Sequence, residues 1–487
     1  MLLDSARSQN ERATTPTQQP TIQKLQTHFK RLKAYLFQTR PGVLQEEMLS
    51  IGRLKLHPNP ERINLLFNKA SPIILSSLIS LVIFHGYLLI QQSNGGSDLV
   101  SADIPKSLML LNGQNPYSTQ PWASPYPPLL LLTVSGIIRV TSFFASQSSL
   151  NLISQQIRLA GLFADAAVAV IIYFAIRART NNPLQALIPA SLFLTLPAIS
   201  TSPLYFFHSD TFGYPILALA TLTLAQRRYF VGTTLLATAT IFKVHPILAL
   251  PLVMIWLIRT RGLRKTLPSI ATATIITALG LILPLAIPGY QQSTLGFNIT
   301  NQGNGTTIIL MRLLNTILPS TVQFTPTEFF TNQIWIATTA LLYTITVGTV
   351  WTKARNLSLI DVVLLGLVAW VIPLKIVYAH YIVWAIIPFI MRGRLKQTII
   401  TIGLLQLADT LTYWSSSPSN DPIPAIIVSY GPLLTSLIIR IIGATALVFV
   451  LHSLRRNPTV LLQKTELTTQ TILVTGTPSR QGRPVAR

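Results

Sequence analysis

Apolar runs separated by short clusters of Lys and Arg repeat along most of this 487-residue chain. The first run, residues 71–90, is long enough as a helix to cross the roughly 30 Å hydrocarbon core of a bilayer. Charged residues make up 10% of the chain, whereas soluble domains carry about 25%. We therefore predict an all-α fold, a polytopic transmembrane helical bundle.

The basic residues indicate how this bundle is oriented. The net charge is +23, and thirteen Lys and Arg residues lie in five clusters between apolar runs. Clusters of this kind are retained on the cytoplasmic side of a membrane, where they meet anionic lipid headgroups. They are Arg177/Arg179, Arg227/Arg228, Arg259/Arg261/Arg264/Lys265, Lys353/Arg355 and Arg392/Arg394/Lys396. The charge therefore predicts membrane lipids as partners, and no nucleic acid.

With these clusters inside, the apolar runs give about twelve spans and two cytoplasmic termini. The spans are residues 71–90, 156–176, 183–203, 211–225, 229–242, 246–258, 267–287, 332–351, 359–374, 381–391, 398–411 and 432–451. We expect residues 129–140 to be interfacial or re-entrant, because a further span there would place Arg177 and Arg179 outside. The predicted parts are a basic tail (1–69, without a signal peptide), a transmembrane domain (70–452) and a second basic tail (453–487).

Several predicted spans are too short for a bilayer and meet at charged residues. Residues 229–242 and 246–258 meet at Lys243 and His245, and residues 359–374 and 381–391 meet between Lys375 and His380. Short helices that meet at charges are tolerated where they line a polar cavity. Both junctions fall on the predicted outer side. So does a polar island at residues 98–128, which carries Asp98 and Asp103.

An outer cavity with carboxylates and several cations fits one kind of chemistry. The cations bind a lipid-linked phosphate, while a carboxylate deprotonates an incoming hydroxyl. The chain has no cysteine, which excludes disulfides and thiolate metal sites. It also lacks a Gly-rich phosphate loop, so a nucleotide-sugar site is not expected.

Five motifs then resemble the GT-C superfamily of integral-membrane glycosyltransferases. The likeness is closest to prokaryotic polyprenyl-phosphate-mannose-dependent enzymes and the related first mannosyltransferase of GPI-anchor synthesis. The motifs are Leu110-Leu111-Asn112-Gly113-Gln114-Asn115-Pro116-Tyr117 with Tyr126-Pro127-Pro128-Leu129, then Phe163-Ala164-Asp165-Ala166, Phe207-His208-Ser209-Asp210, Ile241-Phe242-Lys243-Val244-His245-Pro246, and Lys375 with His380-Tyr381-Ile382-Val383-Trp384. The family's first-loop acid usually sits near a tyrosine pair, which Asp98-Leu99-Val100 lacks. Asp98 and Asp103 therefore both stay candidates.

The resemblance implies an inverting transfer of a sugar, by likeness mannose, from a polyprenyl-phosphate donor to an acceptor hydroxyl of a glycan or lipid on the outer face. Asp98 or Asp103 would be the general base. Substrate-binding residues would be Arg158, Lys243, His245, Lys375 and His380 at the phosphate, His208 and Asp210 at sugar or acceptor hydroxyls, and Asn115, Tyr117, Tyr126 and Asp165 around them. No cofactor is implied; a divalent metal is compatible but not required. The membrane would be the plasma membrane in a prokaryote and the endoplasmic reticulum in a eukaryote.

Two other classes of function stay open. A lipid-linked glycan or polar-lipid transporter would also have cations in a cavity, but it would not need an outer carboxylate beside Asn115-Pro116-Tyr117. A non-catalytic scaffold related to glycosyltransferases would tolerate alanine at Asp98, Asp103, Lys243 and Lys375.

Overall fold

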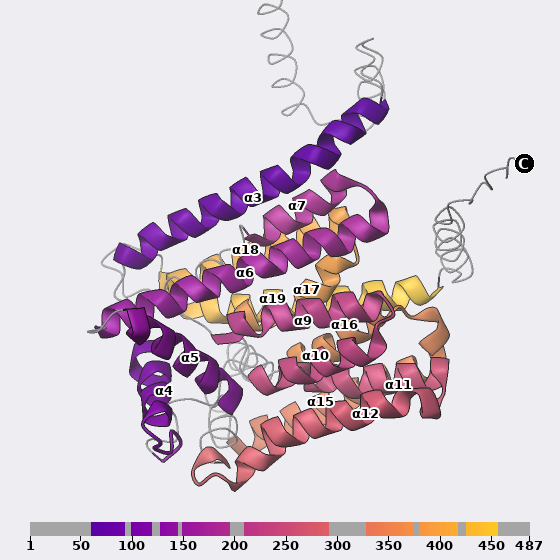
Figure 1. Cartoon of the computed structure of the whole chain (residues 1–487). Coiled ribbons are helices and arrows are strands. Elements are labelled where there is room, and N and C mark those ends of the chain that lie inside the picture. Colours follow the sequence, from indigo (N-terminus) through magenta and orange to yellow (C-terminus); the bar gives the residue numbers. More distant parts are fainter. Residues whose placement is uncertain are drawn as a thin grey trace, which may run out of the picture. The chain divides into compact units, whose positions relative to one another are not determined.

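The computed structural model describes residues 60–92, 99–118, 127–144, 149–194, 209–291, 328–373, 379–416 and 425–455 (Figure 1). The chain divides into two units, Met1–Leu66 and Phe67–Arg487, and the described residues belong to the second unit, apart from the first turns of helix α3. Every regular element among the described residues is helical, which confirms the all-α prediction.

The helices follow one another with short connections. The α-helices are α3 (Pro60–Gln92), α4 (Ile104–Leu111), α5 (Pro128–Phe144), α6 (Leu150–Thr180), α7 (Pro183–Leu194), α9 (Tyr214–Ala225), α10 (Tyr229–Phe242), α11 (Ala249–Arg261), α12 (Leu263–Thr277), α15 (Glu328–Lys353), α16 (Leu359–Val371), α17 (Ala379–Met391), α18 (Leu395–Ser416) and α19 (Ala425–Arg455). Short π or 3-10 segments are η1 (Leu99–Asp103), η3 (Ser209–Phe212), η4 (His245–Leu248), η5 (Ala278–Ile282), η6 (Leu283–Ala286) and η9 (Ala354–Asn356).

Three helical stretches of the described chain are long and apolar enough to cross a membrane. They are Asn68–Gln91, Leu150–Thr180 and Leu263–Ala286. The other apolar helices are shorter, so the figure of twelve spans stays a prediction. Leu150–Thr180 begins six residues earlier than the span predicted at 156–176, and its most apolar window is 56% buried, against 17% for each of the other two. Helix α6 is therefore an inner helix, and α3 and α12 are outer ones.

Helix α16 lies at the centre of the largest core. All of its residues except Trp370 are buried, and a helix that is apolar on every side belongs in the interior. It packs against α9, α11, α17 and α19. Gly366 allows the close approach of α11, because a Cβ atom at this position would lie 2.4 Å from the Cα atom of Ala249. This core holds α17, which carries part of the candidate site, and α9, which directly follows the turn that bears Asp210.

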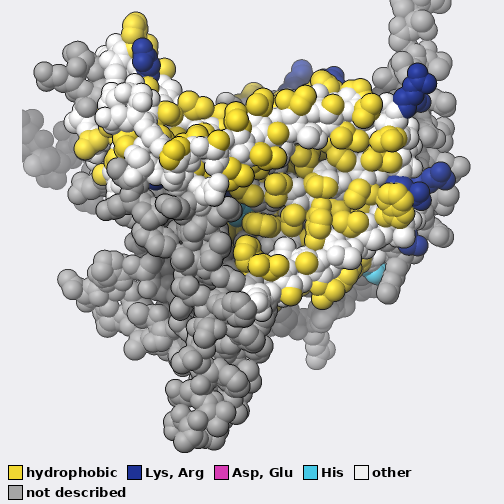
Figure 2. Space-filling model, turned by 90° about the horizontal axis from the view of Figure 1, so that it is seen from below, with side chains coloured by type: hydrophobic (Ala, Val, Ile, Leu, Met, Phe, Trp, Pro, Cys, Tyr) yellow, Lys and Arg dark blue, Asp and Glu magenta, His cyan; other side chains and the backbone are white. Residues whose placement is uncertain are grey.

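The outer helices expose large apolar side chains. Examples are Leu81 and Phe84 on α3, Phe143 on α5 and Leu279 in η5, each at least 60% exposed. Figure 2 shows a broad hydrophobic face, with the Lys and Arg side chains in view around its margin. A soluble protein rarely exposes so large an apolar surface, whereas a helix surrounded by lipid does.

One end of the bundle brings together residues of two predicted cytoplasmic clusters, Arg177/Arg179 and Arg392. Arg392 forms an ion pair with Asp361 (Nε–Oδ1 2.9 Å), and Arg179 donates to the carbonyl of Met391 (2.7 Å). Arg177 donates to the Asn68 side chain (2.6 Å), which joins the end of α6 to the start of the apolar part of α3. We call this end, defined by Arg177, Arg179, Asp361 and Arg392, the basic end. At the opposite end Arg158 donates to the Ile90 carbonyl, so α3 and α6 are antiparallel.

The polar island at residues 98–128 contains helix, whereas the resemblance to the GT-C superfamily implies an outer loop there. Residues 99–111 form η1 and α4, with Pro105 in the first turn of α4, where its missing N–H leaves no bond unmade. The segment expected to be interfacial or re-entrant, 129–140, is part of the continuous helix α5, which packs on α4 through two Ser107 contacts, to the Leu131 carbonyl and from the Ser135 hydroxyl. The position of α5 relative to a bilayer stays a prediction.

Candidate functional site

The first cluster of the site is a buried ion pair between Asp210 and Lys243. The Lys243 Nζ atom lies 3.1 Å from Asp210 Oδ2, and the two side chains are 0% and 11% exposed for Asp210 and Lys243 respectively. The other carboxylate oxygen, Oδ1, accepts a hydrogen bond from the Trp384 indole N–H (2.9 Å). The Lys243 ammonium also lies 5.1 Å from the centre of the Tyr381 ring. Residues far apart in the sequence thus complete one buried acid–cation pair.

Local sequence explains how these side chains reach one another. Helix α10 ends at Phe242 because Pro246 has no N–H to donate to the Phe242 carbonyl, and Lys243 is then extended (φ −147°, ψ 135°). Asp210 lies in η3, which turns into α9 at Gly213. A Cβ atom at Gly213 would lie 2.4 Å from the Trp384 ring, so glycine here lets Trp384 pass close beside Asp210.

His245 is enclosed by aromatic rings next to this ion pair. Its ring is parallel to that of Trp384 (centroids 6.1 Å apart) and lies 4.7 Å from Tyr381 and 5.8 Å from Trp370. Neither ring nitrogen has a hydrogen-bond partner within the described chain. Burial, and next the charge of Lys243, lower the pKa of His245 to about 3, against the opposing effect of Asp210. The imidazole is therefore neutral at physiological pH.

The second cluster contains Asp103, Lys106 and Tyr117. Asp103 closes η1 and Lys106 follows one helical turn later in α4, and they are 1% and 3% exposed. The Lys106 ammonium lies 5.6 Å from the centre of the Tyr117 ring and has no hydrogen-bond acceptor among the described residues. Burial lowers the pKa of Lys106, and the Asp103 carboxylate partly opposes this. The pair thus has the residue types of an acid–base or anion-binding site.

A turn at Asn115 holds Tyr117 against this pair. The Asn115 side chain accepts from the Tyr117 backbone N–H (3.0 Å) and donates to the Pro288 carbonyl (2.9 Å). Tyr117 then packs edge-on against Tyr290, with ring centroids 4.9 Å apart. Gly289 has φ +83°, and a Cβ atom there would lie 2.1 Å from the Tyr117 carbonyl oxygen. The predicted Asn-Pro-Tyr motif therefore forms a contact between two segments that are far apart in the sequence.

The two clusters are joined through one small core. It is formed by Leu99, Ile104, Leu130, Val134, Ile138, Ile153 and Ile157. Ile104 directly follows Asp103 in the sequence, and Phe212, in the same 3-10 turn as Asp210, packs against this core. Two of the predicted acidic site residues, Asp103 and Asp210, therefore lie in elements that border the same small core.

Helix α6 supplies two further predicted residues. Arg158 is fully buried and donates from Nη2 to the Ile90 carbonyl (2.7 Å). Asp165 is 2% exposed, and neither of its carboxylate oxygens accepts a hydrogen bond within the described part of the chain. Seven residues separate them, so they lie on one face of the helix. A partner for Asp165 from a neighbouring helix, which would give it a purely structural role, is not found among the described residues.

Other predicted site residues lie outside the described chain. These are Asp98, Tyr126, His208 and Lys375, together with the side chain of His380. Within the described residues, no group of three or more His, Asp or Glu side chains is placed to hold a metal ion. Lys106 was not predicted as a site residue, although its spacing of three from Asp103 puts both on one side of a helix and could have indicated it.

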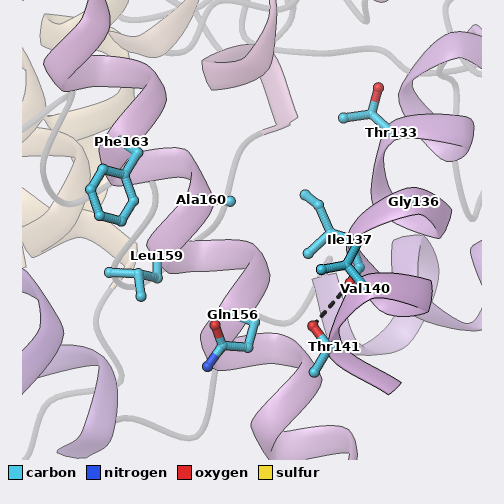
Figure 3. Close-up of a pocket in the computed structure, with 9 residues that line it drawn as sticks. All are labelled: Thr133, Gly136, Ile137, Val140, Thr141, Gln156, Leu159, Ala160 and Phe163. Atoms are coloured by element: carbon cyan, nitrogen blue, oxygen red, sulfur yellow. Dashed lines mark hydrogen bonds between the residues drawn. The ribbon is translucent and has the colours of Figure 1, made fainter. Parts of the chain in front are cut away.

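A shallow apolar hollow of about 410 Å³ lies between α5 and α6 (Figure 3). It is lined by Thr133, Gly136, Ile137, Val140, Thr141, Gln156, Leu159, Ala160 and Phe163. The α6 residues among these lie on a different face from Arg158 and Asp165, because helical residues repeat every 3.6 positions. None of the predicted site residues lines the hollow, which is thus separate from the candidate site.

Comparison with known proteins leaves the candidate site to be interpreted from its own residues. No model of a known protein family matches the chain, and no curated protein matches it.

Proposed function

We propose that this protein is a membrane glycosyltransferase that transfers a sugar from a polyprenyl-phosphate donor to an acceptor hydroxyl on the outer face of the membrane. The resemblance of its motifs to the GT-C superfamily suggests mannose as the sugar. The observation that supports the proposal most is the burial of Asp103 and Lys106 one helical turn apart, beside the built Asn115 turn. A carboxylate and an ammonium side by side are the groups that this reaction needs.

The transfer needs only the Asp103 carboxylate, the acceptor hydroxyl and the polyprenyl-phosphate donor to account for every bond that forms and breaks. The acceptor O–H loses its proton to the Asp103 carboxylate, and the oxygen attacks the anomeric carbon of the sugar. The bond from that carbon to the phosphate oxygen breaks, and its electron pair leaves with the polyprenyl phosphate. The configuration at the anomeric carbon is inverted. General base catalysis of this kind typically contributes about 10²–10⁴-fold in rate.

The two clusters take different parts in this scheme. The leaving phosphate gains a negative charge, which a fixed cation in a water-poor site stabilises. Lys243 already compensates Asp210 in a 3.1 Å ion pair, so we assign this pair to the architecture that orients sugar or acceptor hydroxyls. His245, as a neutral imidazole, contributes no charge to the phosphate. Asp98 stays an alternative base, because it lies outside the described residues.

Asp165 favours a second candidate function, transport of a lipid-linked glycan or polar lipid. A buried carboxylate in an apolar helix is costly and commonly marks an ion or proton path in transporters. Asp165 has no hydrogen-bond partner among the described residues, so its carboxylate could take up a proton or a cation.

Donor specificity tests the proposed function directly. Membranes containing the protein are given radiolabelled mannose on polyprenyl phosphate or on a guanosine diphosphate carrier, with extracted glycolipids as acceptors. We expect incorporation from the lipid-linked donor alone. Movement of the intact lipid-linked sugar between leaflets, without incorporation, would support the transporter. Asp165→Asn would abolish such movement.

A further inference from the structure

We propose that Lys106 is the cation that binds the phosphate of the lipid donor, in a site completed by Asp103 and Tyr117. The inference deepens the proposed function, on which it rests for the identity of the lipid. The chemistry recognised is a phosphate oxygen attached to a prenyl chain.

Burial without a hydrogen-bond acceptor sets Lys106 apart from four other cations of the bundle. Lys243 has Asp210, Arg158 has the Ile90 carbonyl, Arg179 has the Met391 carbonyl and Arg392 has Asp361. Lys106 is 3% exposed, and its ammonium faces the Tyr117 ring at 5.6 Å without a hydrogen-bond acceptor among the described residues. An ammonium carries three N–H donors, and leaving them unused in the interior is costly. A group with negatively charged oxygens would satisfy them.

The N–H groups of the Lys106 ammonium can bind a phosphate, because no carboxylate of the described residues accepts them. Asp103 is close enough for its charge to act on Lys106, but it makes no hydrogen bond to the ammonium. The N–H groups of Lys106 are thus available for a ligand. Tyr117 is fixed by Asn115 and Tyr290, so the ring that faces the ammonium is held in place.

Binding of farnesyl phosphate, a short prenyl phosphate, tests the inference without any sugar transfer. The full-length protein is purified in phosphatidylcholine nanodiscs as wild type, Lys106→Met, Lys106→Arg and, as a control, Lys353→Met, which makes the same change at an exposed lysine. We expect Lys106→Met to raise the Kd for farnesyl phosphate about tenfold or more, the effect of losing one hydrogen bond to a charged group. Lys106→Arg should retain most of the affinity, and Lys353→Met all of it.

Two companion ligands identify the part of the molecule that Lys106 recognises. Farnesol, which lacks the phosphate, should bind equally to all four proteins. Inorganic phosphate should compete with farnesyl phosphate for the wild type, because the headgroup is what Lys106 binds. Equal loss of farnesol and farnesyl phosphate in Lys106→Met, or unchanged binding of both, would overturn the inference.

Stability separates a ligand site from a structural lysine. Lys106→Met removes a buried charge that has no hydrogen-bond acceptor but leaves the buried Asp103 carboxylate, so the ligand-free variant should be destabilised less than Lys243→Met, which breaks a 3.1 Å ion pair. A strongly destabilised variant would instead show a structural role. Where this variant does not fold, Lys106→Gln, which keeps a polar side chain without the charge, replaces it. It should lose affinity for farnesyl phosphate and not for farnesol, and wild-type affinity of Lys106→Gln for farnesyl phosphate would refute the site.

The sugar-transfer assay keeps the two proposals apart. Phosphate-dependent binding through Lys106 in a protein that transfers no sugar would uphold the site and reject the transferase. Transfer by the wild type, with unchanged farnesyl phosphate binding in Lys106→Met, would uphold the transferase and reject this assignment of the phosphate cation.

Discussion

The buried Asp210–Lys243 pair allows a quantitative prediction about stability. Lys243→Met leaves the Asp210 carboxylate, whose side chain is 0% exposed, with the Trp384 hydrogen bond but without its cation. Breaking a buried ion pair from one side typically costs about 3–5 kcal/mol. We therefore expect Lys243→Met to lower the free energy of unfolding by about 4 kcal/mol.

Removing the charge of the other partner, Asp210, should lower the free energy of unfolding by less. In Asp210→Asn the new amide oxygen still accepts from Trp384, and Lys243 keeps the Tyr381 ring at 5.1 Å and some exposure to solvent. A cation over an aromatic ring is worth about 0.5–2 kcal/mol, so we expect a loss of about 2–3 kcal/mol. The double variant leaves no isolated charge and should lose about 3–4 kcal/mol. The coupling between the sites is then about 2–4 kcal/mol.

Unfolding in mixed detergent micelles, followed by tryptophan fluorescence, measures these four proteins in a double-mutant cycle. The control is Thr238→Val on α10, whose hydroxyl donates to the helix carbonyl of Thr234. If the two single losses add in the double variant, the ion pair contributes nothing specific and our account of the cluster is wrong.

Three further predictions concern single positions. The imidazole of His245 binds a proton below about pH 6.5 in the unfolded chain but not in the folded protein, where its pKa is lowered to about 3. The free energy of unfolding should therefore fall by about 1.4 kcal/mol between pH 7.5 and 5.5. His245→Gln should remove that pH dependence in the same unfolding assay. Asp361→Asn at the basic end breaks the 2.9 Å ion pair with Arg392 and should lower the free energy of unfolding by about 3 kcal/mol. Sugar transfer per folded molecule should stay unchanged. A selective loss of transfer would contradict the placement of the site at the other end of the bundle. Gly289→Ala should displace Tyr117, lower stability by more than about 1 kcal/mol and lower sugar transfer. The control Gly403→Ala, in a helix with open space around the Cβ position, should be neutral or stabilising. Equal effects of the two substitutions would refute the role of the Tyr117 contact.

The fold class followed from the sequence because it depends on local properties. Apolar run length and the low share of charged residues predict helices, and the described elements are helical throughout. The polar island was the exception. Its helix α4 is only eight residues long, and the turn residues around Asn115 dominate the sequence pattern there. A short helix in a polar segment leaves little periodicity to read.

The residues of the candidate site were easier to predict than their partners. Asp210, Lys243 and His245 stood out as polar groups in apolar surroundings, and the structure brings all three together. The pairing of Lys243 with Asp210, and of Asp210 with Trp384, was not predicted. These contacts join positions 33 and 174 residues apart, and a pairing over such a separation depends on helix packing rather than on local spacing.

Sugar transfer by Asp103→Asn, in membranes supplied with polyprenyl-phosphate-mannose, tests the central claim most directly. Asp98→Asn and Asp361→Asn are measured beside it, each at matched amounts of folded protein. The account predicts a loss of about 10²-fold or more in Asp103→Asn, with near wild-type rates in the other two. Full transfer by Asp103→Asn would contradict it, and a selective loss in Asp98→Asn would move the base to that residue.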